Sequence, residues 1–242
     1  MVSMAAKTKR AERRTDALSK ERIVEAAIEI LDAGGENALT FRALSARLAT
    51  GAGAIYHHVA SKDALLAAAT NGVISQVMAG VDRGLEHSVN RGANRGVEPR
   101  AAVRALALGM FDAIDAHPWV GTELSREPWQ FASLQILEGF GQQVMALGVP
   151  ARAQFDCASA LLNYVLGLAG QYAAGARLLA GVTDRSTFLA TVAARWAQLD
   201  PAEYPFVRQV AAQLPGHDDR EQFLAGIDLI LTGITSEKTG RP

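Results

Sequence analysis

Apolar side chains recur three and four residues apart along most of the chain, and this spacing limits the possible folds more than any other feature. Such a spacing places side chains on one face of an α-helix, whereas a half-buried strand needs strict alternation. Convincing alternation and turn-bounded runs of Val, Ile and Thr are both missing from the sequence. Of the 242 residues, 49% are hydrophobic and 20% charged, so a sizeable core can form. The sequence therefore predicts an all-α protein.

The first part of the chain predicts several short helices joined by tight breaks. An amphipathic first helix ends at Gly34, and Thr40 opens a short second helix. A third helix is expected at Ala52–Val59. Ser61 can cap a fourth, with Asp63 in the first turn, where the helix dipole favours negative charge. The first three helices are expected to form one compact unit.

The second and third helices have the pattern of a helix-turn-helix. They are separated by the small residues at 49–51, and Ala52–Val59 is then the recognition helix. If Ala52, Ile55 and Val59 face inward, the remaining side chains face the open side, and the small N-terminal residues allow a close approach to the major groove. The side chains expected there are Gly53, Ala54, Tyr56, His57 and His58, flanked by Arg42 and Lys62 as phosphate contacts.

Four short motifs in this region occur in an order and at a spacing that resemble the tetracycline-repressor (TetR) family of bacterial transcriptional regulators. They are Ile23–Ala27, Leu39–Leu44, Ala54–Val59 and Ser61–Leu65, within about residues 18–66. The resemblance implies a homodimer that binds palindromic operator DNA, usually as a repressor, and releases it when a small molecule binds. The family's DNA contacts carry over onto Thr40, Arg42, Ala52, Gly53, Ala54, Tyr56, His57, His58 and Lys62.

The rest of the chain predicts longer helices that form a larger second domain. A loop is expected from Ser88 to Pro99, followed by four or five helical segments punctuated by Pro and Gly. Five basic residues at the chain start suggest an arm that tracks phosphates or a solvated tail. The expected division is a basic flexible arm at 1–17, a DNA-binding domain at 18–64, a ligand-binding and dimerisation domain at 65–236 and a tail at 237–242.

The expected ligand cavity is built around a helix at Phe155–Leu179, which has two apolar rows. Two buried faces suit a helix that lines a cavity on one side and contacts a partner subunit on the other. No charged residue lies between Asp156 and Arg177, so a neutral, mainly apolar effector is expected. An equally weighted alternative is that the polar residues are satisfied within a core without ligand. The expected ligand-binding residues are His117, Phe140, Gln143, Asn163, Tyr164, Leu168, Gln171 and Tyr172.

The last helix is expected to complete a homodimer interface. Ile227, Ile230 and Ile234 lie on one apolar stripe of this helix. They would pack with the Phe155–Leu179 helix against the same pair of helices from a second subunit.

The remaining composition argues against other classes of protein. The single cysteine, Cys157, excludes a disulfide scaffold and a cysteine-based zinc cluster. We expect no metal site at His57 and His58, because neighbouring helical residues point in different directions and no acidic partner clusters with them. No cofactor is expected, and no nucleophile–base or carboxylate pair at usable spacing indicates an enzyme. The competing class is a helical small-molecule-binding or adaptor protein without DNA function.

A membrane location is not expected. The basic chain start lacks the apolar run of a secretory signal, which favours the cytoplasm. Two uncharged windows, 64–81 and 157–176, contain polar residues and much Ala and Gly, so buried helices of a soluble protein account for them better than membrane spans.

Overall fold

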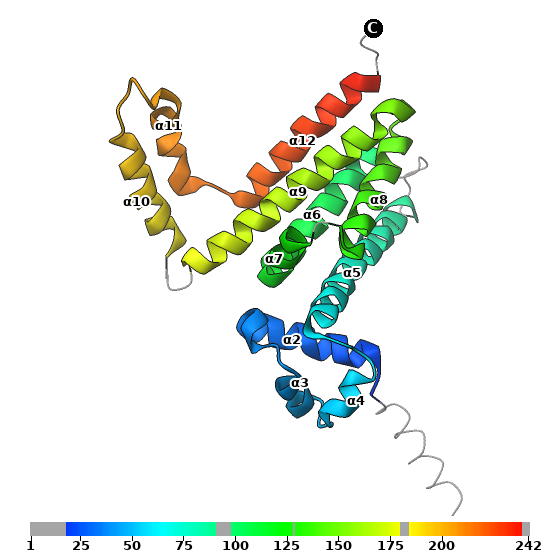
Figure 1. Ribbon diagram of the computed structural model, residues 1–242. Coiled ribbons are helices and arrows are strands. Elements are labelled where there is room, and N and C mark those ends of the chain that lie inside the picture. Colours follow the sequence, from blue (N-terminus) through cyan, green and yellow to red (C-terminus); the bar gives the residue numbers. More distant parts are fainter. Residues whose placement is uncertain (1–17, 91–97, 128, 180–183, 239–242) are drawn as a thin grey trace, which may run out of the picture.

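The computed structural model describes residues 18–90, 98–127, 129–179 and 184–238, and every regular element within these ranges is a helix (Figure 1). This confirms the all-α prediction. The elements are α2 (Lys20–Ala38), α3 (Phe41–Arg47), α4 (Ala52–Tyr56), α5 (Lys62–Asn90), α6 (Pro99–Ala116), α7 (Pro118–Arg126), α8 (Phe131–Ala146), α9 (Ala151–Leu179), α10 (Arg185–Ala197), α11 (Pro205–Val210), the 3₁₀ helix η1 (Ala211–Gly216) and α12 (Asp219–Lys238). The predicted arm at 1–17 lies outside the described residues.

Helices α2, α3 and α4 form a small head at one end of the molecule (Figure 1). Thr40 caps α3 as predicted, because its side chain accepts a hydrogen bond of 3.1 Å from the backbone N–H of Ala43. The predicted stop of the first helix is a kink, since Gly35 has φ 68° and the helix then resumes to Ala38. Apolar side chains from all three helices meet in a common core, including Ile23, Leu44 and Ile55. This core continues into the body, against which α2 packs through α5 and α7.

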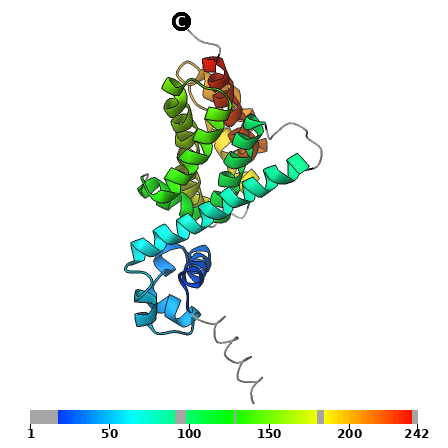
Figure 2. The same cartoon turned by 90° about the vertical axis from the view of Figure 1, so that its right-hand side faces the viewer.

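Helix α5 connects the head to the rest of the molecule without a break (Figure 2). Ser61 caps it as predicted, accepting a bond of 3.1 Å from the Ala64 N–H. The helix packs against α2 in the head and against α6, α7 and α8 beyond it. It extends to Asn90, past the expected start of the loop at Ser88. The domain boundary predicted at residue 64 thus falls within a continuous helix.

Helix α5 also contains the segment Lys62–Gly84, which is long and apolar enough to cross a membrane by length and composition alone. The core helix of a soluble protein passes the same test. Here the segment contributes Leu65, Leu66 and Ile74 to the hydrophobic core, as the sequence predicted for a buried helix.

The body is a bundle in which α6, α8, α9 and α12 pack around one core, with α7 beneath α9 (Figure 1). Met110, Ile136, Phe140, Leu161 and Phe223 are nearly inaccessible to solvent there. The body has more helical segments than predicted, because the short helices α11, which begins at Pro205, and η1, which contains Pro215, precede α12. Helices α10, α11 and η1 pack mainly on one another and project from the side of the bundle (Figure 1).

Candidate DNA interface, junction and ligand cavity

The recognition helix is shorter than predicted. It spans Ala52–Tyr56 and not Ala52–Val59, and the preceding turn places Ala49 at φ 49°. Ile55 and Val59 are buried as expected. Ala52, the first residue of α4, is exposed, so its predicted inward orientation is wrong.

The outward side of α4 is open and carries small residues at its start. Ala52, Gly53 and Ala54 are all exposed, and a Cβ added at Gly53 would meet no atom within 4 Å. A surface of this kind allows another molecule to approach the backbone at the helix N-terminus closely. This is the arrangement in which a recognition helix enters a major groove.

Aromatic side chains lie at the other end of α4. The ring of Tyr56 is 52% exposed and stacks on Phe41, with ring centroids 4.1 Å apart and planes inclined by 19°. The rings of His57 and His58 meet edge to face at 5.6 Å. Sequence reasoning missed the supporting role of Phe41, although an aromatic residue directly after the cap Thr40 was a usable signal. Phe41 therefore restrains the orientation of the predicted contact Tyr56.

Two predicted phosphate contacts lie in different surroundings. Arg42 is exposed in the first turn of α3. The Nζ of Lys62 is partly buried and donates a hydrogen bond of 2.8 Å to the backbone oxygen of Glu36, near the end of α2. This bond gives Lys62 a structural role that the sequence analysis missed, and its contact with DNA stays a prediction.

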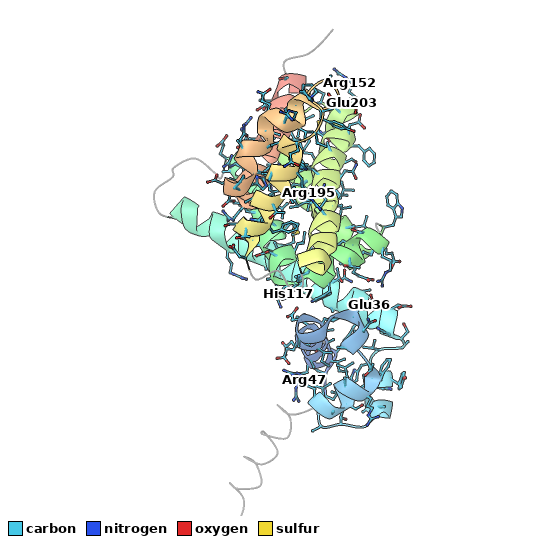
Figure 3. All side chains as sticks on the ribbon, turned by 90° about the vertical axis from the view of Figure 1, so that its left-hand side faces the viewer. Glu36, Arg47, His117, Arg152, Arg195 and Glu203 are labelled. Carbon is cyan, nitrogen blue, oxygen red and sulfur yellow. The ribbon has the colours of Figure 1, made fainter. Side chains whose placement is uncertain are left out.

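The junction between head and body contains two polar clusters, of which the first is centred on Asp32 of α2. Its Oδ1 accepts a hydrogen bond of 2.7 Å from the indole Nε1 of Trp119, and the Nδ1 of His117 lies 2.7 Å from the same oxygen. Figure 3 shows His117 at the end of the body nearest the head. His117 was predicted as a ligand-binding residue, but the structure places it in this junction because the chain turns from α6 into α7 there.

The second cluster joins Glu36 of α2 to Arg126 and Glu123 of α7. Arg126 bonds Glu36 Oε2 at 2.5 Å and Glu123 Oε2 at 3.1 Å. Burial raises the pKa of Glu123 above its ordinary value, while the positive charge of Arg126 opposes that shift. The hydrogen bond to Glu36 is the main reason that the pKa of Arg126 is raised. Together the two clusters bind the C-terminal half of α2 to α7.

A cavity of about 560 Å³ lies between α5, α6 and α8. It is large enough for a small organic ligand. The described residues that line it are Met78, Val81, Asp82, Ala102, Leu106, Phe131, Leu134, Gln135, Leu137, Glu138, Gly139, Gln142 and Gln143.

Of the predicted ligand-binding residues, the structure brings Gln143 to this cavity. Phe140 is fully buried in the core, and Asn163 and Gln171 are exposed on α9. Leu168 is half-buried on the same helix, which contributes no described residue to the cavity lining. The side chain of Tyr172 lies outside the described residues. Helix α9 packs against α6, α7, α8 and α12, and a ligand contact on this helix stays a prediction.

Tyr164, another predicted ligand contact, belongs to the packing of α9 on α12. Its ring stacks on Phe223 at 5.4 Å with an interplanar angle of 7°, and its hydroxyl donates to the Phe223 backbone oxygen at 3.3 Å. Burial raises the pKa of Tyr164. A Cβ at Gly226 would lie 2.0 Å from that hydroxyl oxygen, so the absence of a side chain there gives Tyr164 its place.

The outer faces of α9 and α12 carry different residues from those expected. Ile227 and Ile234 are buried within the chain itself, so their predicted role as subunit contacts is wrong, whereas Ile230 is half-buried and its contact with a partner stays a prediction. The stripe that they form packs on the body's own core. Among the described side chains of these two helices, the large apolar ones that are exposed are Leu229 on α12, at 75%, and Phe155 on α9, at 70%.

Relatives of known sequence resemble the chain over most of its length. An HTH-type transcriptional regulator of Saccharopolyspora erythraea is 29% identical over 151 residues, which are 62% of this chain but only 59% of that protein. The HTH-type transcriptional repressor DrrR1 of Streptomyces coeruleorubidus is 26% identical over 222 residues, or 90% of this chain and 77% of the relative.

Solved structures share the fold. The transcriptional regulator SCO7222, a TetR from Streptomyces coelicolor, is 50% identical with a TM-score of 0.77, and the match covers 92% of this chain and 100% of that one. ActR from the same organism, in complex with actinorhodin, is 21% identical with a TM-score of 0.69, over 93% of this chain and 100% of that one.

Two family models match the two parts of the chain. Residues 23–69 match the model for bacterial regulatory proteins of the tetR family, and residues 97–237 match the tetracyclin repressor-like C-terminal domain. The first match contains the helix-turn-helix of α3 and α4, and the second contains most of the body. The chain therefore belongs to the TetR family and is a DNA-binding transcriptional regulator.

Proposed function

We propose that the protein is a cytoplasmic, homodimeric repressor that binds operator DNA through α3 and α4 and releases it when a small molecule enters the cavity between α5, α6 and α8. It acts by binding and not by catalysis. The observation that carries this proposal is the continuity of α5. The helix begins in the head at Lys62 and lines the cavity with Met78, Val81 and Asp82.

The continuity of α5 offers a physical route for the regulation. A dimeric helix-turn-helix protein reads two half-sites about one turn of DNA apart, so its affinity depends on the spacing of the two heads. A ligand that binds better to a conformer with the wrong spacing lowers operator affinity. Reversing a 99:1 population requires about 5.5 kcal/mol of differential binding.

The proposed dimer uses the outer faces of α9 and α12. Phe155 and Leu229 are large exposed apolar side chains on these helices. Burying them against the same faces of a second copy would form a four-helix, isologous interface. The proposal keeps the helices predicted from the sequence and replaces the contact residues on α12.

The DNA contacts are proposed on the open side of α3 and α4. Arg42 is exposed there, and Tyr56 is stacked on Phe41. Thr40, Ala52, Gly53, Ala54, His57, His58 and Lys62 complete the proposed set. Two findings support this proposal. The relative DrrR1 is named a repressor, which supports repression, and the crystal structure of ActR in complex with actinorhodin supports the binding of an effector.

The DNA part of the proposal is tested with a duplex that the full-length protein selects from a randomised pool. Arg42→Ala should weaken binding and reduce the slope of log affinity against log salt by about one unit. Arg195→Ala, which removes an exposed arginine from α10 (Figure 3), should change neither quantity. Failure to select any duplex would contradict the proposed operator-binding repressor.

The effector part is tested on the same duplex. Compounds that raise the melting temperature of the protein are added to the complex, and its dissociation is followed by fluorescence anisotropy. Leu106→Trp places a larger side chain in the cavity lining. It should abolish both the rise in melting temperature and the dissociation of the complex, while DNA binding in the absence of compound remains. A compound that releases DNA equally well from this variant would place the effector site elsewhere.

A further inference from the structure

The cavity between α5, α6 and α8 has an apolar floor and an acidic rim. Ala102 and Leu106, both buried, belong to the floor. Asp82 of α5 and Glu138 of α8 line the same cavity and are exposed to solvent. Among the described residues of the lining there is no Lys, Arg or His. The described lining therefore carries a formal charge of −2 from these two carboxylates when both are ionised.

Helix geometry places the two carboxylates on facing rows. Met78 and Asp82 are one turn apart on α5, and Glu138 lies one turn after Leu134 on α8. The two helices approach closely at the floor, because a Cβ at Gly139 would lie 2.6 Å from the Met78 side chain. An apolar group on this floor would thus have carboxylates from both walls nearby.

Neither carboxylate is neutralised by a cation among the described residues. Glu138 accepts a hydrogen bond of 2.9 Å from the side chain of Gln142, which is a neutral donor. No described basic residue forms an ion pair with Asp82 or Glu138. Their negative charges are therefore available to a ligand. A cationic ligand gains Coulomb attraction from both, whereas an anionic one is repelled.

We propose that the effector is an amphipathic cation, with an apolar ring system on the floor and a protonated amine held by Asp82 and Glu138. An ammonium group has three N–H donors, enough to bond both carboxylates. The inference rests on the proposed function, because it assigns the ligand class of the same cavity. It replaces the neutral effector expected from α9, which does not contribute to the described lining.

The test compares three fluorescent probes of equal shape and different charge: pyren-1-ylmethylamine, pyren-1-ylmethanol and pyrene-1-carboxylate. Each is titrated into the full-length protein at neutral pH. The amine should bind about 10-fold more tightly than the alcohol, the combined effect of two partly exposed ion pairs. The carboxylate should bind most weakly. Added salt should lower the binding affinity of the amine and leave that of the alcohol unchanged.

Charge-neutral variants assign this preference to the two residues. Asp82→Asn and Glu138→Gln should each reduce the advantage of the amine, and the double variant should remove it. Alcohol binding should stay within about twofold throughout, which shows that the cavity is intact. The matched control is Asp115→Asn, which removes an exposed carboxylate of α6 that does not line the cavity.

The possible outcomes separate the charge assignment from the regulatory function. Equal binding of amine and alcohol, an unchanged amine preference in the double variant, or no binding of any probe overturns the cationic effector. If the alcohol then still releases the selected duplex, the proposed function stands without the assignment of a cationic effector. If the amine binds through both carboxylates but saturation leaves DNA binding unchanged, the cation site stands and the proposed regulation fails.

Discussion

The phenol of Tyr164 fills a space that exists because position 226 has no side chain. Its ring is stacked on Phe223, and its hydroxyl bonds the backbone of α12. The same contacts explain why a sequence reading misplaces this residue. Aromatic side chains at helical spacing suit both a ligand cavity and a helix–helix contact, and the glycine that decides between them is 62 positions further along the chain.

Gly226→Ala should therefore destabilise the protein. The new methyl group would lie 2.4 Å from the Tyr164 Cζ, so the ring must leave its stack, at a cost of about 1–3 kcal/mol. Urea denaturation measures the change. Gly141→Ala, at a helical glycine with open space around it, should be neutral or stabilise by about 0.5–1 kcal/mol. The cost of Gly226→Ala should shrink in a Tyr164→Leu background, and an unchanged cost would show that Tyr164 is not the obstacle.

Glu123 provides a pH-dependent prediction at the same scale. It is 5% exposed, and burial raises its pKa above the ordinary value of 4.5. A carboxyl with a raised pKa contributes stability that is present below the unfolded value and is lost as pH rises through the folded value. Glu123→Gln does not titrate. Its stability relative to the native protein should therefore improve as pH rises from 4.5 through the raised pKa.

Denaturation midpoints measured across that pH range check the prediction. The exposed neighbour Glu127 offers a control, because Glu127→Gln removes a carboxylate of similar position without a buried contact. A stability difference between Glu123→Gln and the native protein that does not change with pH would show that Glu123 titrates alike in the folded and unfolded chains.

At the scale of elements, the contact between α2 and α7 depends on few groups. The carboxylate of Asp32 accepts the indole N–H of Trp119, which is itself only 8% exposed. A buried donor left without its acceptor costs about 1–3 kcal/mol. The two helices belong to the head and the body, so a change in this bond alters both stability and the attachment of the head.

A double-mutant cycle isolates the Asp32–Trp119 bond. Asp32→Ala should destabilise the protein by about 1–3 kcal/mol, since it leaves the indole N–H unpaired. In a Trp119→Phe background the same substitution should cost less, with a coupling energy above about 0.5 kcal/mol. Thermal unfolding of the four proteins measures it. Strictly additive effects would show that the hydrogen bond contributes nothing to the attachment of the head.

The elements that could be predicted from the sequence are those with local causes. Thr40 and Ser61 begin helices because their own side chains accept hydrogen bonds from nearby N–H groups. The faces of α9 and α12 have no such local cause. Apolar spacing identifies a buried stripe but not its neighbour, so Ile227 was assigned to a partner although it packs within the chain. The cavity escaped prediction because three separate helices create it.

At the scale of the whole molecule, the proposed dimer depends on Leu229. Leu229→Glu would place a charge in the interface and should raise the dimer dissociation constant at least about 30-fold. The monomer should keep its fold, since the side chain is 75% exposed. Sedimentation velocity and circular dichroism measure the two properties. Ala101→Glu, an equal charge on the exposed face of α6, should leave the dimer intact. Unchanged sedimentation of Leu229→Glu would place the interface elsewhere.

The unbroken course of α5 also restricts how such a protein can be recombined. Each residue inserted between Leu66 and Val73 would rotate the head by about 100° about the helix axis and move it by about 1.5 Å. Asp32 and Glu36 would then lose their partners on α7, although every head contact and every cavity residue were retained. Heads can therefore be exchanged between relatives only if the number of residues in α5 is preserved. That number sets the rotation of the head about the helix axis.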